Sequence, residues 1–357
     1  MTNTATDINS SFGSGVAPTA SPPATITFAD FGLDPLIQKA VAEQGYNNPT
    51  PIQAQSIPHV LAGSDLMGAA QTGTGKTAAF VLPIIQKILR HASNSASPAR
   101  HPIRALVLTP TRELAVQVAD NAANYSKHTD LRTAVVYGGV DMKEQVQVLR
   151  NGVEILIATP GRLLDHIGSK VANLSQVELL VLDEADRMLD MGFLPDVERI
   201  LSQTPASRQT MLFSATMPGV IIGMARTYMT NPTHIRAIDA TSESTTVDAI
   251  EQHVWRAHPM DKPELIGRIL QAEGRNLCII FCKTKRNAQK LFDELEERGF
   301  AVGAIHGDLG QGAREQALRA LRAGKIDVLV ATDVAARGID VEGVTHVINY
   351  ECPDDEK

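Results

Sequence analysis

The sequence contains few cysteines, no long apolar run and no excess of positive charge, and each absence excludes a class of protein. The 357 residues include three cysteines, which form no C-x-x-C pair, so metal or redox chemistry at thiols is not expected. Cys278 and Cys282 lie in the apolar run LCIIFC, where packing inside a buried strand is the expected role.

Membrane and secretory signals are absent too. No stretch approaches the roughly 20 apolar residues that cross a bilayer, and the N-terminus lacks the basic start and apolar block of a signal peptide. We therefore expect a cytoplasmic protein without a membrane partner. The formal net charge is −7, so any binding of nucleic acid must rely on local groups rather than on overall positive charge.

The length of the chain exceeds what one hydrophobic core usually serves, which predicts two domains. Residues 1–25 are rich in Thr, Ser, Ala and Pro with few large apolar residues, and we predict a disordered tail there. The polar stretch 238–249 suits an interdomain linker. The predicted domains are therefore residues 26–237 and residues 250–357.

Apolar runs of strand length alternate with longer helix-like segments in both domains. Because these runs lack polar alternation, they predict strands covered on both faces, hence parallel α/β sheets with crossover helices. Ligands of such sheets bind at the carboxyl ends of the strands. Residues 91–101 have the composition of a surface loop. The predicted strand regions are 105–109, 133–139, 154–159, 178–186 and 209–216 in the first domain, and 276–282, 301–307, 327–333 and 346–351 in the second.

The stretch AQTGTGKT, residues 70–77, follows a strand-like segment and precedes an apolar helix-like run. Gly73 and Gly75 would let backbone N–H groups point at phosphates, Lys76 would supply a positive charge, and Thr77 could bind Mg²⁺. Ala70 replaces the opening glycine of the general phosphate-loop pattern, and a glycine-rich turn without a ligand is the alternative.

The run LLVLDEAD places carboxylates at the end of an apolar strand. Asp183 could hold Mg²⁺, and Glu184 could orient or deprotonate an attacking water. Alone, such an acidic group is commonly a solvated turn. In order after the phosphate loop within one α/β unit, it predicts a nucleoside triphosphate site with Lys76, Asp183 and Glu184 as catalytic residues.

At this point the sequence resembles the DEAD-box ATP-dependent RNA helicases, and within them the bacterial RhlE-like branch. The resemblance covers about residues 26–357 and implies an α/β fold of two RecA-like parallel-sheet domains in tandem (a P-loop NTPase), the second of them incomplete. Ala70 is the residue that this family has at its position. The matching motifs are GYNNPTPIQ (45–53), AQTGTGKT (70–77), PTRELA (110–115), GG (138–139), TPGR (159–162), DEAD (183–186), SAT (214–216), HGDLGQGAR (306–314) and ATDVAARGID (331–340).

An amide side chain such as Gln53 can pair with both N6 and N7 of adenine, while a flat side chain stacks on the ring. The resemblance gives these roles to Gln53 and Tyr46, with Phe28 supporting the pocket, and so implies ATP with Mg²⁺. Without the resemblance to this family, we would interpret Gln53 as a solvent-exposed residue of a helix. The ATP-binding set implied is Phe28, Tyr46, Gln53, Ala70, Gln71, Thr72, Gly73, Thr74, Gly75, Lys76, Thr77 and Asp340, with Thr77 and Asp183 at the metal.

For RNA, the resemblance implies contacts by backbone amides, hydroxyls and guanidinium groups, which hold phosphates and sugars without reading bases. Otherwise these would be surface residues with no assigned role. The implied residues are Pro110, Thr111, Arg112, Gly138, Gly139, Thr159, Gly161 and Arg162 in the first domain, and His306, Gly307, Gln311, Arg314, Thr332 and Asp333 in the second. Asp186, Ser214, Thr216 and Arg337 would couple the ATP site to the RNA surface.

The sequence ends at VINYECPDDEK, before the HRIGRTGR motif of the family. Arginines there would stabilise charge on the γ-phosphate, an effect on the order of 10³ to 10⁵ in rate in related phosphoryl transfer. We therefore expect this chain to bind ATP but to hydrolyse it slowly, and to be a truncated form of a longer protein.

Three functions remain after the sequence is read. The first is an RNA-stimulated ATPase that unwinds short duplexes or remodels RNA–protein complexes by closing its two domains. The second is an ATP-gated RNA clamp with slow turnover, and the third, disfavoured by the adenine motif together with DEAD, is a DNA helicase. Ribosome assembly and RNA decay are both open as sources of protein partners.

Overall fold

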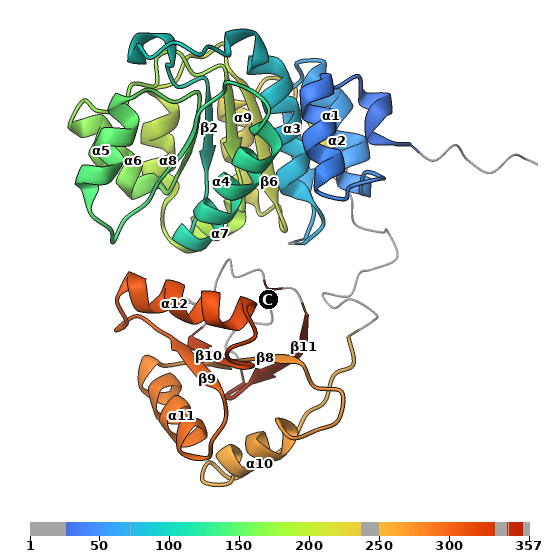
Figure 1. The fold of residues 1–357 in the computed structure, drawn as a ribbon, viewed down its shortest axis with the longest axis vertical. Helices are drawn as coiled ribbons and strands as arrows, with labels where there is room; N and C mark the ends of the chain where they lie inside the picture. The colour runs from blue at the N-terminus through green and yellow to red at the C-terminus, as the bar shows by residue number, and fades with distance from the viewer. Residues whose placement is uncertain (1–25, 72, 237–249, 333–340, 342, 353–357) are drawn as a thin grey trace, which may run out of the picture.

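The computed structural model describes residues 26–71, 73–236, 250–332, 341 and 343–352. These residues form two α/β units, stacked along the long axis of the molecule (Figure 1). The predicted tail (1–25) and the whole of the predicted linker (238–249) lie outside the described residues, as do Thr72, Asp333, Arg337 and Asp340.

The first unit is built on a sheet of seven strands, all paired in parallel, in the order β3-β4-β2-β5-β6-β1-β7. Its strands are β1 (Leu66–Ala69), β2 (Ala105–Leu108), β3 (Thr133–Val136), β4 (Ile155–Ala158), β5 (Leu179–Leu182), β6 (Gln209–Ser214) and β7 (Thr233–Arg236). Its helices are η1 (Phe28–Phe31), α1 (Pro35–Glu43), α2 (Pro51–Leu61), α3 (Lys76–Ile88), η2 (Leu89–His91), η3 (Pro98–Arg100), α4 (Arg112–Ser126), α5 (Met142–Arg150), α6 (Pro160–Gly168), α7 (Ala185–Asp190), α8 (Leu194–Leu201) and α9 (Gly219–Tyr228).

The second unit has a parallel sheet of four strands among the described residues, in the order β11-β8-β10-β9. Its elements are α10 (Lys262–Ile269), β8 (Leu277–Cys282), α11 (Lys285–Glu297), β9 (Val302–Ile305), α12 (Gln311–Arg322), β10 (Val328–Thr332) and β11 (Val344–Asn349). The prediction of two parallel-sheet domains is confirmed.

Helices cover both faces of the first sheet, which explains why its strands read as continuous apolar runs. In β2, Ala105 and Val107 belong to the core on one face, and Leu106 and Leu108 to the core on the other. If polar and apolar residues alternated along the strands, one face of the sheet would be polar and would not pack against apolar helices. The two cysteines of LCIIFC are buried in β8, as expected.

Two local features differ from the sequence reading or were missed by it. Residues 91–101 do run mostly over the surface, but His101 at their end is 1% exposed because it pairs with buried Glu154. Strand β7 was not predicted, because three of its four side chains are at least partly exposed and it lies at the edge of the sheet.

No helix in the described part of the chain is both long and apolar enough to span a membrane.

Candidate functional site

The phosphate loop joins the end of β1 to the start of α3. Gly73 (φ +81°) and Gly75 (φ +87°) adopt left-handed conformations that favour glycine, and Gly75 is the N-cap of α3. The Ala70 N–H donates to the carbonyl of Ser214 (3.1 Å), and the Thr74 hydroxyl donates to the carbonyl of Gln71 (2.7 Å). Hydrogen bonds within the loop and to β6, together with the two left-handed glycines, therefore define the conformation of the phosphate loop.

Two oppositely charged side chains lie buried beside this loop with unpaired polar atoms. Lys76 is 7% exposed and Asp183, at the carboxyl end of β5, is 3% exposed. Neither Lys76 Nζ nor Asp183 Oδ1 has a hydrogen-bond partner among the described residues. Burial raises the pKa of Asp183 to about 6, although the charge of Lys76 acts in the opposite direction. Buried polar atoms normally find partners, so this pair indicates a binding site for a charged or polar ligand.

The residues present fit a triphosphate with Mg²⁺. An ammonium and a helix N-terminus suit phosphate oxygens, while the Asp183 carboxylate and the Thr77 hydroxyl at the same helix start are oxygen ligands of the kind that Mg²⁺ takes. Within the described ranges, no group of three or more His, Cys, Asp or Glu could hold a metal by itself. Mg²⁺ sites commonly use one or two carboxylates plus phosphates, so this arrangement fits.

Glu184 has an uncommon backbone conformation for a side chain of its size, with φ 52° and ψ 52° at the start of α7. Its carboxylate accepts a hydrogen bond from Arg187 Nη1 at 2.6 Å, and its side chain is 7% exposed. Arg187 therefore fixes one end of the predicted base. Sequence reasoning missed Arg187, although an arginine three residues after a carboxylate lies within reach on a helix.

Three of the predicted coupling residues are brought together. The Asp186 N–H donates to Ser214 Oγ (3.1 Å), and Asp186 Oδ2 accepts from the Thr216 N–H (2.8 Å) and hydroxyl (2.9 Å). Burial opposes ionisation of Asp186, but hydrogen bonding with Ser214 and Thr216 outweighs it and holds its pKa below the ordinary value. The start of α7, which follows β5, is thus bonded to the end of β6.

Of the predicted adenine residues, Gln53 contacts the phosphate loop, while Tyr46 and Phe28 stack on each other. Tyr46, 41% exposed, stacks against buried Phe28 with ring centroids 6.4 Å apart. Gln53 is 4% exposed, and its amide donates to the Gly75 carbonyl (3.0 Å) and accepts from the Thr50 N–H (2.9 Å). Both polar atoms of Gln53 are bonded within the protein, so its pairing with adenine stays a prediction. Tyr125, which sequence reasoning missed, donates its hydroxyl to that of Tyr46 (3.4 Å).

Strand order separates two groups of predicted residues along the carboxyl edge of the first sheet. The phosphate loop, Asp183 and Ser214 follow β1, β5 and β6, which are neighbours. The predicted RNA residues follow β2, β3 and β4, which are neighbours on the other side of β5. They are Pro110, Thr111 and Arg112 after β2, Gly138 and Gly139 after β3, and Thr159, Gly161 and Arg162 after β4.

The loops that carry the predicted RNA residues contact one another. Arg112 packs so closely on Gly139 (φ +82°) that a Cβ there would overlap its guanidinium group. Both Nη atoms of Arg162 lie 3.3 Å from the Val140 carbonyl, to which they donate. Thr111 caps α4 by accepting from the Leu114 N–H (3.3 Å). These loops form one surface rather than separate contacts.

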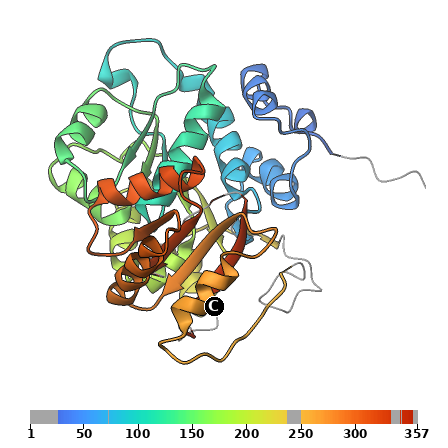
Figure 2. The same ribbon diagram turned by 60° about the horizontal axis from the view of Figure 1, so that its bottom comes forward.

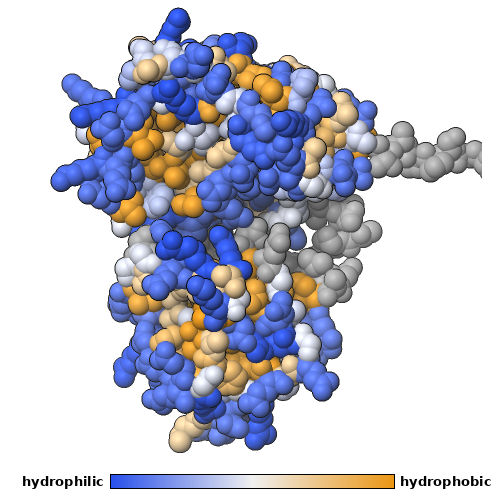
Figure 3. All heavy atoms as spheres, viewed as in Figure 1, coloured by the Kyte–Doolittle hydropathy of each residue, from blue (hydrophilic) through white to orange (hydrophobic). Residues whose placement is uncertain are grey.

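One predicted RNA residue of the second unit, Arg314, contacts the first unit. His306 and Gly307 follow β9, Thr332 ends β10, and Gln311 begins α12. On α12, Arg314 forms an ion pair with Glu113 at the start of α4 (Nη2 to Oε1, 3.1 Å). Figures 1 and 2 both show α12 on the side of the second unit that faces the first. Hydrophilic residues line both sides of this boundary in the view of Figure 3.

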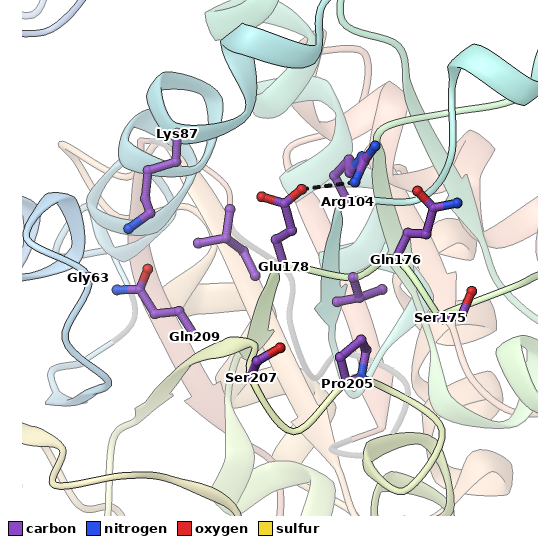
Figure 4. A pocket seen from close by; sticks show the side chains of 11 residues that line it. Gly63, Lys87, Arg104, Ser175, Gln176, Glu178, Pro205, Ser207 and Gln209 are labelled. Carbon is purple, nitrogen blue, oxygen red and sulfur yellow. Dashed lines mark hydrogen bonds and ion pairs between the residues drawn. The ribbon is translucent and has the colours of Figure 1, made fainter.

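A cavity of about 580 Å³ lies at the opposite end of the first sheet (Figure 4). Its lining includes Gly63, Arg104, Glu178 and Gln209, which stand at or just before the starts of β1, β2, β5 and β6. Arg104 pairs with Glu178 there at 3.0 Å. None of the predicted nucleotide or RNA residues that the structure describes lines this cavity, so we do not identify it with the nucleotide site.

Family models, similar proteins and solved structures all indicate the same family for this chain. Residues 50–222 match the family model "DEAD/DEAH box helicase", and residues 261–357 match "Helicase conserved C-terminal domain". The chain is 47% identical over 328 residues to the ATP-dependent RNA helicase CshA of Listeria monocytogenes, and 45% identical over 331 residues to the DEAD-box ATP-dependent RNA helicase CshA of Bacillus subtilis. These alignments cover 92% and 93% of this chain but 61% and 65% of the relatives.

Two solved structures are also similar to this chain. A DEAD box protein from Methanococcus jannaschii is 39% identical with a TM-score of 0.55, and the match covers 92% of this chain and 85% of that one. Saccharomyces cerevisiae Dbp5 bound to RNA and ADP BeF3 is 30% identical with a TM-score of 0.79, covering 92% of this chain and 81% of Dbp5. The structure with lower sequence identity has the higher TM-score. Sequence identity alone therefore does not set the structural likeness.

Proposed function

Because the chain belongs to the DEAD-box helicase family, we propose that it is an RNA-stimulated ATPase that opens short RNA duplexes or remodels RNA–protein complexes. The observation that carries the proposal is the buried pair Lys76 and Asp183 beside a phosphate loop, each with a polar atom that has no partner among the described residues. The chain spans 61% to 66% of the length of the first CshA relatives, and the activity proposed is that of the described domains.

Each residue of the nucleotide site has a role that follows from its chemistry. The Lys76 ammonium contacts the β- and γ-phosphates, and the N–H groups of the loop hold their oxygens. Thr77 and Asp183 are the proposed ligands of Mg²⁺, which supplies neutralisation of phosphate charge when bound. Glu184 orients the attacking water and accepts its proton, while Arg187 holds the carboxylate in place.

Domain closure is the proposed link between the nucleotide and RNA. Asp186, Ser214 and Thr216 bond the ends of β5 and β6, and the surface of loops after β2, β3 and β4 lies beside them. Arg314 and Glu113 join the two units on the RNA side. Likeness to Dbp5 bound to RNA and ADP BeF3 supports this arrangement. A ligand that touches both units would hold them together, and its release would free them.

Recognition of RNA is proposed to be independent of base sequence, because the residues concerned are backbone amides, hydroxyls and guanidinium groups. Contacts to 2′-hydroxyl groups would give preference for RNA over DNA. Protein partners from ribosome assembly or RNA decay, a cytoplasmic location and the narrower RhlE-like assignment stay predictions of the sequence.

The test is steady-state phosphate release from Mg·ATP, with and without a single-stranded RNA and with DNA of the same sequence as the control. We expect stimulation by RNA and little by DNA. Equal stimulation by DNA would overturn the RNA-specific assignment. The same assay tests the sequence-based expectation that this chain turns over slowly.

Substitution Glu184→Gln separates hydrolysis from binding. We expect phosphate release to fall by a factor on the order of 10² or more, since general-base catalysis contributes about 10² to 10⁴. RNA binding in the presence of ATP should persist or last longer, because Gln keeps the shape of the side chain. If wild-type protein already binds RNA durably with ATP but shows no stimulated hydrolysis, the ATP-gated clamp replaces the helicase as the proposed function.

A further inference from the structure

Two buried side chains that the proposed mechanism does not use lie beneath the predicted RNA surface. Gln145, on α5, is 8% exposed, and His166, on α6, is fully buried. Gln145 Nε2 donates to the carbonyl oxygen of Tyr137 (3.0 Å), and Gln145 Oε1 lies 3.2 Å from His166 Nε2. The three residues form a short chain of hydrogen bonds between two helices and a loop.

The carbonyl oxygen of Tyr137 determines which group donates in each of these hydrogen bonds, because a carbonyl can only accept. Only the NH₂ group of Gln145 can donate to a carbonyl, so its oxygen must accept, and His166 must carry its proton on Nε2. Nδ1 of His166 is then a bare acceptor, and it has no hydrogen-bond partner among the described residues. Burial, and then the nearby Arg162 charge, hold the pKa of His166 below its usual value. Neutral His166 is therefore the form that fits.

The bonded loop is the one that carries Gly138 and Gly139. Gln145 holds the carbonyl of Tyr137 just before these glycines, and Arg162 holds the carbonyl of Val140 just after them. His166 lies on the same helix as Arg162, one turn further along. The position of the glycine loop is thus set from α5 and α6 together, and α6 begins with the predicted RNA residues Gly161 and Arg162.

We propose that Gln145 and His166 are positioning residues for RNA: they fix the glycine loop and α6 relative to each other so that both contact the same strand. The proposal rests on the proposed function, because RNA is the ligand of this surface there. A purely structural role would require only that the space be filled, and leucine would fill it. Positioning requires the hydrogen bonds.

The experiment measures binding of a fluorescein-labelled decauridine by anisotropy in the presence of Mg²⁺ and ADP-BeF₃. The variants are Gln145→Leu, His166→Leu, the double variant and His166→Gln, which restores a donor near the position of Nε2. Gln147→Leu is the matched control, because Gln147 lies on the same helix but is exposed, and its side chain bonds to exposed Asn151. Binding of a fluorescent ADP is measured on every variant.

We expect about fivefold weaker RNA binding for each leucine variant, the loss associated with one or two buried hydrogen bonds. The double variant should be no weaker than either single one, because the two residues act in series. His166→Gln and Gln147→Leu should bind RNA like wild type, and ADP binding should not change. Normal RNA binding by Gln145→Leu would overturn the proposal, as would a loss in His166→Gln equal to that in His166→Leu.

Hydrogen exchange supplies a readout that does not depend on RNA. In the free protein, Gln145→Leu should speed amide exchange at residues 138–140 and leave residues 73–77 unchanged. Unchanged exchange in the glycine loop would contradict the proposed positioning even if RNA binding fell. If wild-type protein binds no RNA, the proposed function fails, while the exchange result still decides whether these residues hold the loop.

Discussion

Burial of Asp183 disfavours its charged form and makes stability depend on pH. Its pKa of about 6 in the folded protein exceeds the ordinary value of 3.8 for an aspartate carboxyl group, so between these pH values the folded state binds more protons than the unfolded state. The free energy of unfolding therefore falls as pH rises from about 4 to 6, and the whole penalty is present above pH 6. A nucleotide with Mg²⁺ would relieve it by pairing the carboxylate.

We predict that Asp183→Asn is more stable than wild type at pH 7 without ligand, by on the order of 3 kcal/mol, since one pKa unit corresponds to about 1.4 kcal/mol. Urea unfolding followed by circular dichroism, with EDTA present, measures the difference. At pH 4 the two proteins should be equally stable, because Asp183 is then largely protonated in the folded state. A difference that does not change with pH would contradict this account.

Gly139 offers a second test at the scale of one residue. Gly139→Ala should cost about 1 kcal/mol of stability because of its left-handed backbone, and it should also weaken RNA binding because the new methyl group displaces Arg112. Gly192→Ala is the control: its φ is also positive (+76°) but a Cβ there meets nothing within 4 Å. Equal effects of the two substitutions on RNA affinity, measured by anisotropy, would argue against a role for Arg112.

Among the elements, a buried ion pair joins the segment before β2 to the start of β4. His101 Nδ1 lies 2.5 Å from Glu154 Oε1, both side chains are fully buried, and His101 Nε2 contacts the Ser95 carbonyl (2.7 Å). The other oxygen of Glu154 accepts from the Arg132 N–H next to β3 (2.9 Å). One carboxylate thus connects the starts of three neighbouring strands.

We predict that His101→Ala destabilises the first unit by about 3 to 5 kcal/mol, because it leaves Glu154 buried without its partner. His91→Ala is the matched control, since His91 pairs with Glu178 where both side chains are partly exposed (26% and 30%), and such pairs contribute less than about 1 kcal/mol. Thermal and urea unfolding measure both. Similar losses in the two variants would show that burial of the pair does not matter.

The elements were predictable where burial on both faces imposed an apolar pattern. Every predicted strand region contains or overlaps an observed strand, but several regions were too long, because the residues that follow a strand, such as Tyr137 or Asp183, belong to the site. Site residues that belong to a sequence motif could be predicted from the sequence. Gln145 and His166 could not, because their partners lie on other elements of the folded chain. Arg187 had only the weak signal of its three-residue spacing from Glu184. Thr72, Asp333, Arg337 and Asp340 lie outside the described residues and stay predictions.

At the scale of the whole molecule, the Arg314–Glu113 ion pair joins the two units with little exposure of either side chain (16% and 9%). We predict that Glu113→Arg separates the units in the RNA-free protein, raising the radius of gyration measured by small-angle X-ray scattering. The double variant Glu113→Arg/Arg314→Glu should restore the wild-type value, because it re-forms the pair in reverse. Loss of the pair should cost about 2 kcal/mol. Equal radii in all three proteins would contradict the prediction.

The phosphate loop, the carboxylates and the RNA residues predicted for the first unit follow the strands, whereas the cavity of Figure 4 lies where the strands begin. That end of the sheet is consequently the place for protein engineering. A fluorescent reporter inserted between Ala206 and Ser207, both exposed in the turn before β6, or new termini made there by circular permutation, would leave the chemistry at the far end undisturbed.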